Sequence, residues 1–582
     1  MLKTLLVQVK EFKLPSILTP ACMIGEVICE MIIPVLMGRI VDLGIGGSDM
    51  QYIVRTGLFM LVVAVCGLLF GILGGVFGAK ASAGFARNLR KAMYDNIQTF
   101  SFSSIDKFST SSLVTRLTTD VTNIQNAYQM ILRMAMRAPS SMIIAMVMSF
   151  VISPELARIY LIAVIVLALI MFFMMRRATK YFQQVFRRYD DLNNSVQENV
   201  TSIRVVKAYV REEYEKERFH TAAENIYRMF LKAEMNIAGI SPIMMTVVYS
   251  CILLISWFGA HMIVGGGLGT GQLMSLLAYC MNILMSLMML SVVFVMITMS
   301  EASAKRIAEV INEKSDLTNP ENPCMEVGDG SIRFDNVEFS YRADSSEPVL
   351  KDINLDIRSG ESIGIIGGTG SAKSSLVNLI SRLYDVTKGC VIVGGRDVRE
   401  YDIETLRNQV SVVLQKNVLF SGTILDNLRW GDPNATEEDC RRVCRMACAD
   451  EFIEKMPEGY NTWIEQGGSN VSGGQKQRLC IARALLKKPK ILILDDSTSA
   501  VDTATDAKIR RAFREEIPDT TKLIIAQRIS SVKDCDRIVV MDDGRISGVG
   551  THDELVASNE IYREVYESQV GGAGDADFDK KE

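Results

Sequence analysis

The stretch Gly367–Ser374, GGTGSAKS, decides the fold of the C-terminal half of this 582-residue chain. It follows the apolar run Ser362–Ile366 and precedes the helical run SSLVNLISRLY, so a strand, a tight loop and a helix are predicted in that order. Successive backbone N–H groups of such a loop cradle phosphate oxygens, and the start of the following helix favours their negative charge. Lys373 then reaches the β- and γ-phosphates of a nucleotide, and Ser374 ligates Mg²⁺. The predicted nucleotide-binding residues of this loop are Gly367, Gly368, Thr369, Gly370, Ser371, Ala372, Lys373, Ser374 and Ser375.

One residue of the loop departs from the pattern G-x-x-x-x-G-K-[ST], because Ala372 stands where the last glycine is usual. The alanine adds one methyl group. We expect it to be tolerated provided that this residue does not lie at positive φ, where glycine is favoured.

The sequence from Ile332 onward has the texture of an α/β domain. Short β-rich runs, such as SIGIIG and ILILDD, alternate with helical patterns, as in a mainly parallel sheet. The strand predicted over Ile491–Leu494 ends in Asp495, and a carboxylate in that place can hold the Mg²⁺ shell. We assign 332–568 to this domain, 306–331 to a linker and 569–582 to a disordered acidic tail. The boundary at about 301–330 contains a polar helix and then a connector rich in Pro, Asn and Gly.

The N-terminal half differs, because its apolar residues form six long runs. Each run has about 20 residues or more, enough to cross a hydrocarbon core of about 30 Å as a helix. Six such runs argue against buried helices of a large soluble protein, and the first run is too long for a cleavable signal peptide. We assign 1–305 to a transmembrane domain whose six helices lie near 15–41, 53–79, 130–152, 156–175, 238–264 and 272–298.

The charges between the runs predict the orientation in a cell membrane. The stretches Gly78–Tyr128 and Arg176–Asn236 are long and rich in Lys and Arg. The short links Gly44–Gln51, Ser153–Glu155 and Gly265–Gln272 carry no Lys or Arg. The positive-inside tendency therefore places the long stretches, both termini and the α/β domain in the cytoplasm.

The long cytoplasmic stretches are predicted to be helical. The second contains NNSVQENVTSIRVVKAYVREEYEKERF, which has no Gly or Pro and repeats its apolar residues at helical spacing. We expect the membrane helices to continue far into the cytoplasm and to turn at short crossing helices near Ser103–Ser112 and Thr201–Ala208. These tips can touch a soluble domain, and a merely solvated helical hairpin is the alternative.

Four charged side chains fall inside the predicted spans. Glu26 and Glu30 are four residues apart and share one face of the first span, as Arg133 and Arg137 do on the third. Charges at membrane depth are expensive and usually face a bundle interior or a water-filled cavity. They mark a substrate pathway or gate in one interpretation, and a structural ion pair or snorkelling side chains in the other.

The composition limits the partners of the chain. A net charge of −4 gives no reason to expect a nucleic acid. The 12 Cys residues are scattered without a CxxC pair, which fits free thiols in a reducing cytoplasm. Cys440, Cys444 and Cys448 recur every four residues, and we interpret them as one face of a helix rather than as a metal site.

A further motif, VSGGQKQR, occupies Val471–Arg478. The order of phosphate loop, Gln415, SGGQ, ILILDD, SxxD and a late switch residue resembles the nucleotide-binding domain of an ATP-binding-cassette (ABC) transporter. With six preceding spans, the chain resembles a half-transporter of the exporter type from residue 1 to about 568. The resemblance implies a six-helix transmembrane domain with long cytoplasmic helical extensions, followed by an α/β P-loop ATP-binding-cassette domain that uses ATP and Mg²⁺.

The resemblance also implies a role for each motif. Tyr341 matches the aromatic residue that stacks on adenine, and Gln415 matches the glutamine that senses Mg²⁺ and contacts the membrane domain. Ser374, Gln415 and Asp495 would hold the Mg²⁺ ion. Asp502 matches a loop that crosses to the opposite site, TWIEQGG matches the segment that meets the helix tips, and the two crossing segments match coupling helices. The signature loop, which closes over ATP held by the opposite subunit, is matched by Ser472, Gly473, Gly474 and Gln475.

Two departures from the family lie in the reaction centre. Asp496 stands where the family has the Glu that positions the attacking water, and Gln527 stands where it has the switch His that contacts the γ-phosphate. The Asp carboxylate is one methylene shorter, so it would sit about 1 Å or more from the productive position, a misplacement that can cost roughly 100-fold in rate. Gln can hydrogen-bond but cannot carry charge or shuttle a proton. We expect a catalytic centre that holds ATP rather than cleaving it quickly.

The paired sites of this family suggest how such a chain works. A homodimer would carry both departures in both sites, although its signature loops would be intact. We therefore expect a heterodimer whose second half-transporter carries Glu and His at the matching positions. The signature loop of this chain would close the partner's catalytic site, and its own phosphate loop would form the slow, degenerate site.

Three functions fit these expectations. The favoured one is half of an ATP-driven exporter of amphipathic small molecules, drugs, lipids or peptides, embedded in the lipid bilayer. The alternatives are an importer or lipid translocator on the same scaffold, and a nucleotide-gated regulator or channel. The Met-rich span Met281–Met289 suits a pliable cargo lining, although helix packing or a lipid-facing surface explains it as well.

Overall fold

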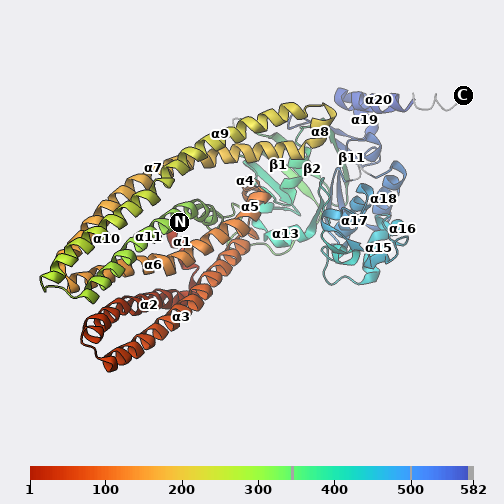
Figure 1. The fold of residues 1–582 in the computed structure, drawn as a ribbon. Coiled ribbons are helices and arrows are strands. Elements are labelled where there is room, and N and C mark those ends of the chain that lie inside the picture. The colour runs from red at the N-terminus through yellow and green to blue at the C-terminus, as the bar shows by residue number, and fades with distance from the viewer. Residues whose placement is uncertain (343–346, 498–500, 575–582) are drawn as a thin grey trace. The chain divides into compact units, whose positions relative to one another are not determined.

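The computed structural model describes residues 1–342, 347–497 and 501–574, which divide into two compact units. The first, here called the helical unit, comprises Met1–Gln98 and Thr110–Glu313. The second, here called the α/β unit, comprises Thr99–Ser109 and the chain from Lys314 onward. Figure 1 shows that the helical unit contains only helices, whereas the α/β unit combines sheets with shorter helices.

Six helices of the helical unit are long and apolar enough to cross a membrane. Among the described residues they cover Lys10–Ile45, Met50–Ile97, Thr110–Ile152, Pro154–Met174, Pro242–Val264 and Thr270–Asn312. Each contains or overlaps one of the six predicted spans. The prediction of six membrane helices is therefore confirmed, and the chain is a multi-pass membrane protein.

The helices of this unit follow one another through short turns. Two π-helical turns lie in the spans: η2 (Ile40–Ile45) ends the first span, and η3 (Arg116–Asp120) lies inside the third. The α-helices are α1 (Leu2–Val7), α2 (Lys13–Arg39), α3 (Met50–Ile97), α5 (Thr110–Thr115), α6 (Val121–Ile152), α7 (Pro154–Thr201), α8 (Ile203–Ala208), α9 (Glu212–Ala238), α10 (Ile240–Val264) and α11 (Thr270–Asn312).

Long helical extensions continue the spans, as predicted. Helices α3 and α7 each contain 48 residues, which corresponds to about 72 Å at 1.5 Å per residue and exceeds the hydrocarbon core. Among the described residues the membrane span of α7 covers Pro154–Met174, and the polar continuation of this helix lies beside α9 (Figure 1). The short helix α8 joins these two helices at their tip.

The buried apolar core of the helical unit gathers side chains of α7, α10 and α11, with contributions from α2 and α6. Helix α11 also packs along α2. Tyr279 of α11 donates its hydroxyl to the backbone oxygen of Met31 in α2. Gly38 and Gly271 allow these two helices to approach closely, because a Cβ atom on Gly271 would lie 2.0 Å from the carbonyl oxygen of Gly38. The two helices are therefore held together by packing and by a buried hydrogen bond.

A six-stranded sheet organises the α/β unit, in the order β12-β11-β3-β10-β9-β6. All neighbouring pairs are parallel except β11 with β12. Its strands are β3 (Ser362–Gly367), β6 (Val410–Val413), β9 (Ile491–Asp495), β10 (Thr521–Ile525), β11 (Arg537–Asp542) and β12 (Arg545–Gly550).

The register of the central strands decides where the functional loops lie. Ile525, at the end of β10, is level with Ile365 of β3 on one side and with Asp495 of β9 on the other. The carboxyl ends of these three strands therefore meet at one edge of the sheet. Ligands of open α/β sheets bind at such an edge.

Two further sheets and several helices complete this unit. An antiparallel sheet has the order β2 (Leu350–Ile357), β1 (Ile332–Phe339), β4 (Lys388–Val393) and β5 (Arg396–Asp397), and β7 (Gly422–Thr423) pairs with β8 (Trp463–Ile464). The helices are α4 (Phe102–Lys107), α12 (Lys373–Ile380), α13 (Ile403–Gln409), α14 (Ile424–Leu428), α15 (Glu437–Met446), α16 (Asp450–Ile453), α17 (Gly473–Leu486), α18 (Thr503–Glu516), α19 (His552–Ser558) and α20 (Glu560–Gly574).

The regular Cys spacing is a packing pattern. Cys440, Cys444 and Cys448 are buried in the apolar core that α15 and α17 share. Among the described residues, no group of three or more His, Cys, Asp and Glu side chains could hold a metal ion.

The structure differs from the predicted segment bounds in three places. Helix α11 runs to Asn312, past the predicted end of the transmembrane domain at residue 305, because EASAKRIAEVIN contains no helix breaker. Residues 99–109 belong to the α/β unit rather than to the helical unit. Helix α20 continues to Gly574, so 569–574 is helical where a disordered tail was predicted, and 575–582 lies outside the described residues.

Candidate functional site

The phosphate loop leaves β3 and enters α12 through a left-handed residue. Ala372 is the N-cap of α12 and has φ 68°. The condition under which we expected this alanine to be harmless is therefore not met, because the turn from strand to helix requires a conformation that disfavours a Cβ atom by about 1–2 kcal/mol. Its methyl group packs against the apolar core below the loop, which offsets part of this strain.

Lys373 is held over the loop by three hydrogen bonds. Its Nζ donates to the carbonyl oxygens of Gly367 and Gly368 at 2.9 and 2.8 Å and to Ser371 Oγ at 3.2 Å. Burial lowers the pKa of Lys373, while the carboxylates of Asp495 and Asp496 oppose this shift. The ammonium group is thus placed at the sheet edge where phosphates would bind.

The candidate Mg²⁺ ligands come together from β9 and α12. Ser374 Oγ donates to Asp495 Oδ1 at 3.0 Å. Asp495 is buried at the end of β9, and burial raises its pKa while the Ser374 hydroxyl opposes the shift. A hydroxyl and a buried carboxylate are oxygen ligands of the kind that Mg²⁺ prefers, so these residues fit the ion that the sequence implies.

Asp496 and Gln527 contact each other directly. Gln527 Nε2 donates to Asp496 Oδ2 at 2.8 Å. Asp496 has φ 48°, a conformation that Asp adopts more readily than most residues. Burial raises the pKa of Asp496, and hydrogen bonds from Gln527 and Gln415 oppose that rise. Gln415 therefore reaches the same carboxylate as Gln527.

Gln569, which the sequence analysis assigned to the disordered tail, holds the backbone next to Gln527 in place. Gln569 of α20 donates Nε2 to the carbonyl oxygen of Gln527 at 2.9 Å, and its Oε1 accepts from the backbone N–H of Ile529 at the same distance. The side chain thus clamps the backbone on both sides of residue 528. No local motif marks Gln569, because its partners lie 40 or more residues away in the sequence.

The signature loop forms the start of α17. Ser472 is the N-cap, its Oγ accepts from the backbone N–H of Gln475 at 3.3 Å, and Gln475 Oε1 accepts from the backbone N–H of Ser472 at 2.9 Å. This capping box leaves Ser472 and Gly473 exposed and Gly474 partly exposed at the positive end of a helix, where an anion is favoured. The loop can therefore present a phosphate-binding surface outward.

Asp502 lies at the start of α18. Its side chain accepts from the backbone N–H of Thr505 at 2.9 Å, and this hydrogen bond lowers its pKa. The preceding residues 498–500, part of the SxxD motif, lie outside the described residues.

Tyr341 belongs to an aromatic cluster beside the phosphate loop. Its hydroxyl lies 2.8 Å from Ser375 Oγ, and its ring meets the edge of Tyr384 with centroids 5.1 Å apart. Tyr341 remains 45% exposed, which leaves surface for a base to stack on. The cluster thus links Tyr341, the residue expected to stack on adenine, to the phosphate loop.

The crossing helix α4 rests on the same cluster. Tyr384 donates its hydroxyl to Asp106 Oδ2 at 2.7 Å, and the ring of Phe102 lies 6.0 Å from that of Tyr384. Burial, and then the hydrogen bond to Asp106, raise the pKa of Tyr384. Ser103 also donates to Asp316 of the linker at 2.7 Å. A solvated tip is therefore excluded for α4, and the sequence did not reveal Tyr384.

Three of the four charged residues singled out in the spans, Glu26, Glu30 and Arg137, form one clamp in the helical unit. Arg137 of α6 donates Nη1 to Glu26 Oε1 at 2.7 Å and Nη2 to Glu30 Oε2 at 2.9 Å. One guanidinium thus bridges both carboxylates of α2. Arg133 lies one helical turn before Arg137, and its aliphatic stem lies against Gly78 of α3.

Comparisons with known proteins agree with this architecture. The family model described as ABC transporter transmembrane region matches residues 17–288, and the model described as ABC transporter matches residues 350–499. The uncharacterised ABC transporter ATP-binding protein YfiB of Bacillus subtilis is 35% identical over 552 residues, which cover 95% of this chain and 96% of that protein. The ATP-dependent lipid A-core flippase of Desulfotalea psychrophila is 31% identical over 492 residues, covering 83% and 84%.

A solved structure shares the fold. The structure of a bacterial Atm1-family ABC exporter with ATP bound has a TM-score of 0.82 and 23% sequence identity, and the match covers 96% of this chain and 99% of that one. The order of six membrane helices followed by a nucleotide-binding domain is therefore the exporter-type arrangement. The chain belongs to the ABC transporter family, as a half-transporter that joins one transmembrane region to one ATP-binding cassette.

Proposed function

We propose that this chain is the degenerate-site half of a heterodimeric ATP-driven exporter of amphipathic molecules. The observation that carries the proposal is the hydrogen bond from Gln527 Nε2 to Asp496 Oδ2 at 2.8 Å. The carboxylate that should position a water accepts from a neutral amide donor. The amide cannot take a proton or carry charge, so the pair supports ATP binding better than rapid hydrolysis.

The remaining parts of the nucleotide site support ATP binding. Lys373 and the loop amides would hold the phosphates, Tyr341 would stack on adenine, and Ser374, Asp495 and Gln415 would hold Mg²⁺. When bound, Mg²⁺ would neutralise charge on the β- and γ-phosphates. The site is thus equipped to retain nucleotide while lacking an efficient base.

The intact signature loop supports the proposal that this chain acts together with a second half-transporter. Ser472 and Gln475 form an intact capping box, and Asp502 caps α18. We propose that Ser472–Gln475 and Asp502 complete a nucleotide site held by a second half-transporter that carries Glu and His. Hydrolysis at that site would then drive transport by the pair.

The proposed location is the cell membrane, with the α/β unit and both termini in the cytoplasm. The excess of Lys and Arg in the long extensions supports this orientation. A lipid is a specific candidate cargo, because a relative at 31% identity is an ATP-dependent lipid A-core flippase. Because Arg137 is already paired with Glu26 and Glu30, these three residues are better suited to a gate between α2 and α6 than to an open ligand site. Arg133 is the nearby cation that would bind an anionic lipid head group.

The test compares the chain alone with the assembled pair. The chain would be purified alone in lipid nanodiscs and, separately, with the half-transporter that co-purifies with it from its native membrane. We expect negligible ATP hydrolysis by the chain alone and robust hydrolysis by the pair. Rapid hydrolysis by the chain alone, abolished by Asp496→Asn, would contradict the proposal because it would show that this chain's own site works.

A further inference from the structure

The C-terminal helix α20 contacts the loop that carries Gln527. This loop, residues 526–531, follows strand β10 and ends in the short 3₁₀-helix η7 (Ile529–Ser531). Gln527 and Arg528 are exposed in the middle of the loop, whereas Ile529 is buried in the apolar core. Packing therefore fixes the end of the loop more firmly than its middle, where Gln527 lies.

The side-chain amide of Gln569 pairs with the backbone on both sides of Arg528. Its Nε2 donates to the carbonyl oxygen of Gln527 and its Oε1 accepts from the backbone N–H of Ile529, each at 2.9 Å. One amide thus supplies the donor and the acceptor that these two backbone groups require. A glutamate could not donate to the carbonyl of Gln527, and an asparagine is one methylene shorter.

Helix α20 is anchored to the α/β unit by residues other than Gln569. Tyr562 is fully buried, and its hydroxyl lies 2.8 Å from Nδ1 of His552 in α19. Asn559 Oδ1 accepts from the backbone N–H of Tyr562 at 2.9 Å, and Val565 packs against the apolar core. Gln569 comes seven residues after Tyr562 and four after Val565, so the three share one face of the helix. The anchored helix therefore holds Gln569 against the loop.

The side chain of Gln527 lies at the edge of the sheet where nucleotide phosphates would bind. It donates to Asp496 Oδ2 at 2.8 Å. Strand β10, which precedes Gln527, lies between β3, which leads into the phosphate loop, and β9, which leads into Asp496. Lys373 of the phosphate loop is near enough to Asp496 for their charges to interact. The Gln527 amide thus shares this edge with the ammonium group that would reach the terminal phosphates.

An amide donor in this place can distinguish a triphosphate from a diphosphate. The Nε2 group of Gln527 has two N–H bonds, and Asp496 uses one of them. The other can donate to an anionic phosphate oxygen, and hydrogen bonds to charged acceptors are the stronger class. ADP lacks the γ-phosphate and would make no such bond.

We propose that Gln569 is a positioning residue of this chain's own nucleotide site, which holds the Gln527 amide at the γ-phosphate and so prolongs the residence of a nucleoside triphosphate. Gln569 acts through the backbone of 527–529 and does not itself touch the nucleotide. The inference rests on the proposed function, in which this site retains ATP, and it adds the part of the fold that sets the residence time.

The clamp helps because it orders the loop before nucleotide binds. A loop that is already held in its binding conformation loses less conformational entropy when the phosphate contact forms. Without Gln569, the exposed backbone of Gln527 and Arg528 would have to be ordered by the nucleotide itself. The triphosphate would then leave sooner, whereas the diphosphate, which makes no contact with Gln527, would be unaffected.

The release of two fluorescent nucleotides from the full chain in lipid nanodiscs tests the inference. The chain is loaded in Mg²⁺ with the mant derivative of AMP-PNP, a non-hydrolysable triphosphate, or with mant-ADP. Release is followed by stopped-flow fluorescence after excess unlabelled ATP is added. We expect Gln569→Ala and Gln569→Glu to release the triphosphate about 3- to 10-fold faster, because each loses at least one backbone hydrogen bond. Release of the diphosphate should not change.

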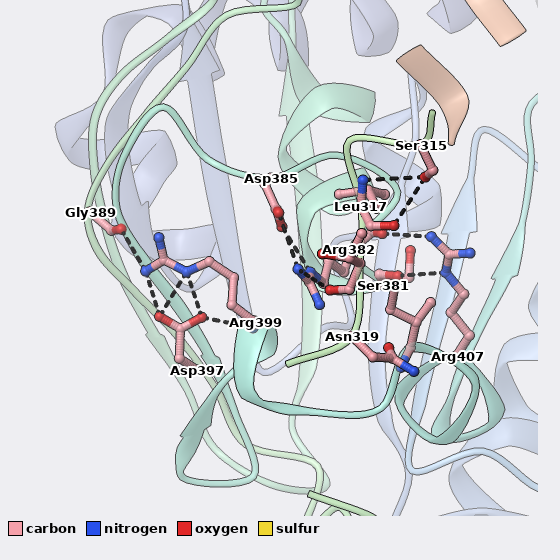
Figure 2. A network of polar contacts seen from close by, with 12 residues as sticks. Ser315, Leu317, Asn319, Ser381, Arg382, Asp385, Gly389, Asp397, Arg399 and Arg407 are labelled. Carbon is pink, nitrogen blue, oxygen red and sulfur yellow. Dashed lines mark hydrogen bonds and ion pairs between the residues drawn. The ribbon is translucent and has the colours of Figure 1, made fainter. Parts of the chain in front are cut away.

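Two variants are matched controls. Ser568→Glu adds the same negative charge as Gln569→Glu at the neighbouring position of α20. Arg399→Ala removes another contact between a side chain and a backbone carbonyl, because Arg399 donates to the carbonyl oxygen of Gly389 at 3.2 Å and to Asp397 at 3.0 Å (Figure 2). Asp397 belongs to β5, the edge strand of the antiparallel sheet. Neither control should change the release of either nucleotide.

A double-variant cycle tests whether Gln569 acts through Gln527. Gln527→Ala alone should accelerate release of the triphosphate, because it removes the amide donor. Adding Gln569→Ala to this variant should give no further acceleration, since two residues that act through one contact are not additive.

Three results would overturn the inference: unchanged triphosphate release in both Gln569 variants, equal acceleration of triphosphate and diphosphate, or a further acceleration when Gln569→Ala is added to Gln527→Ala. The second result would give Gln569 a purely structural role. Because mant-AMP-PNP is not hydrolysed, none of these results depends on the ATPase rate of the chain alone. A failure here is therefore distinguishable from a failure of the proposed function.

Discussion

Gln527 donates its side-chain amide to Asp496 across the ends of neighbouring strands β10 and β9, with Nε2 2.8 Å from Oδ2. The contact joins the two positions at which the chain departs from its family. It occupies a lone pair of the carboxylate with a donor that cannot change its charge. Burial raises the pKa of Asp496, whereas the hydrogen bond from Gln527 stabilises the ionised carboxylate and opposes that rise.

Restoring both family residues should activate this chain's own site. We expect Asp496→Glu with Gln527→His to raise the ATPase rate of the chain alone in nanodiscs by up to roughly 100-fold, because the longer carboxylate can reach the water. Asp496→Asn with Gln527→His is the matched control, since it supplies the His without the carboxylate. An unchanged rate in the first variant would show that other residues limit hydrolysis.

The left-handed conformation of Ala372 predicts an unusual response to glycine. Ala372→Gly should raise the unfolding temperature of the α/β unit by about 1–3 °C. The backbone strain that glycine removes is larger than the stabilisation lost with one partly buried methyl group. Ala512→Gly, inside α18, should lower it because glycine weakens a helix interior. Thermal unfolding followed by intrinsic fluorescence measures both. A decrease of similar size for the two variants would refute the strain at residue 372.

The Gln569 clamp predicts that α20 stabilises the loop that carries Gln527. Gln569→Ala removes two hydrogen bonds to the backbone of 527 and 529, together about 1–3 kcal/mol of local stability. Hydrogen–deuterium exchange over 526–531 should therefore become faster. Ser568→Ala is the neighbouring control, because the Ser568 hydroxyl donates to the carbonyl oxygen of Val565 on its own helix, and it should leave exchange unchanged.

The buried carboxylate of Asp495 is predicted to lower the stability of the nucleotide-free protein in a pH-dependent way while it supports Mg²⁺–ATP binding. Because the folded-state pKa of Asp495 is raised, its ionised form destabilises the fold. This destabilisation is fully present above the folded-state pKa and disappears as the pH falls to the ordinary pKa of 3.8. Asp495→Asn should therefore stabilise the nucleotide-free protein at neutral pH, with a smaller gain at acidic pH, while weakening Mg²⁺–ATP binding. Asp519→Asn, at an exposed position, is the control. A gain that grows on acidification would contradict the shift.

The architecture could be predicted from the sequence because local sequence patterns determine its main elements. Long apolar runs predict membrane helices, and the GGTGSAKS stretch between a strand and a helix predicts the phosphate loop. A polar helix was predicted after the last span, but its continuity with that span in α11 was not, because the change from apolar to polar residues was taken as the end of the domain.

Features that depend on distant partners were not predictable. Asp106 and Tyr384 are 278 residues apart in the sequence, and Gln569 and Gln527 are 42 apart, so no local spacing indicates these contacts. The positive φ of Ala372 also depends on the turn into α12 rather than on the alanine itself. The cations Arg407, Lys416 and Lys487 likewise come together only when α13, β6 and α17 pack against one another, because these residues belong to separate segments of the sequence.

The most direct measurement of the central claim compares two variants in the assembled pair. Ser472→Arg alters the signature loop that is proposed to close the partner's site, whereas Asp496→Asn alters only this chain's own site. ATPase and transport rates are measured for each variant in reconstituted vesicles. The account predicts a severe loss for Ser472→Arg, of at least about 100-fold, and a modest change for Asp496→Asn. Equal damage by the two variants would show that this chain's own site is the working one and would contradict the asymmetric mechanism.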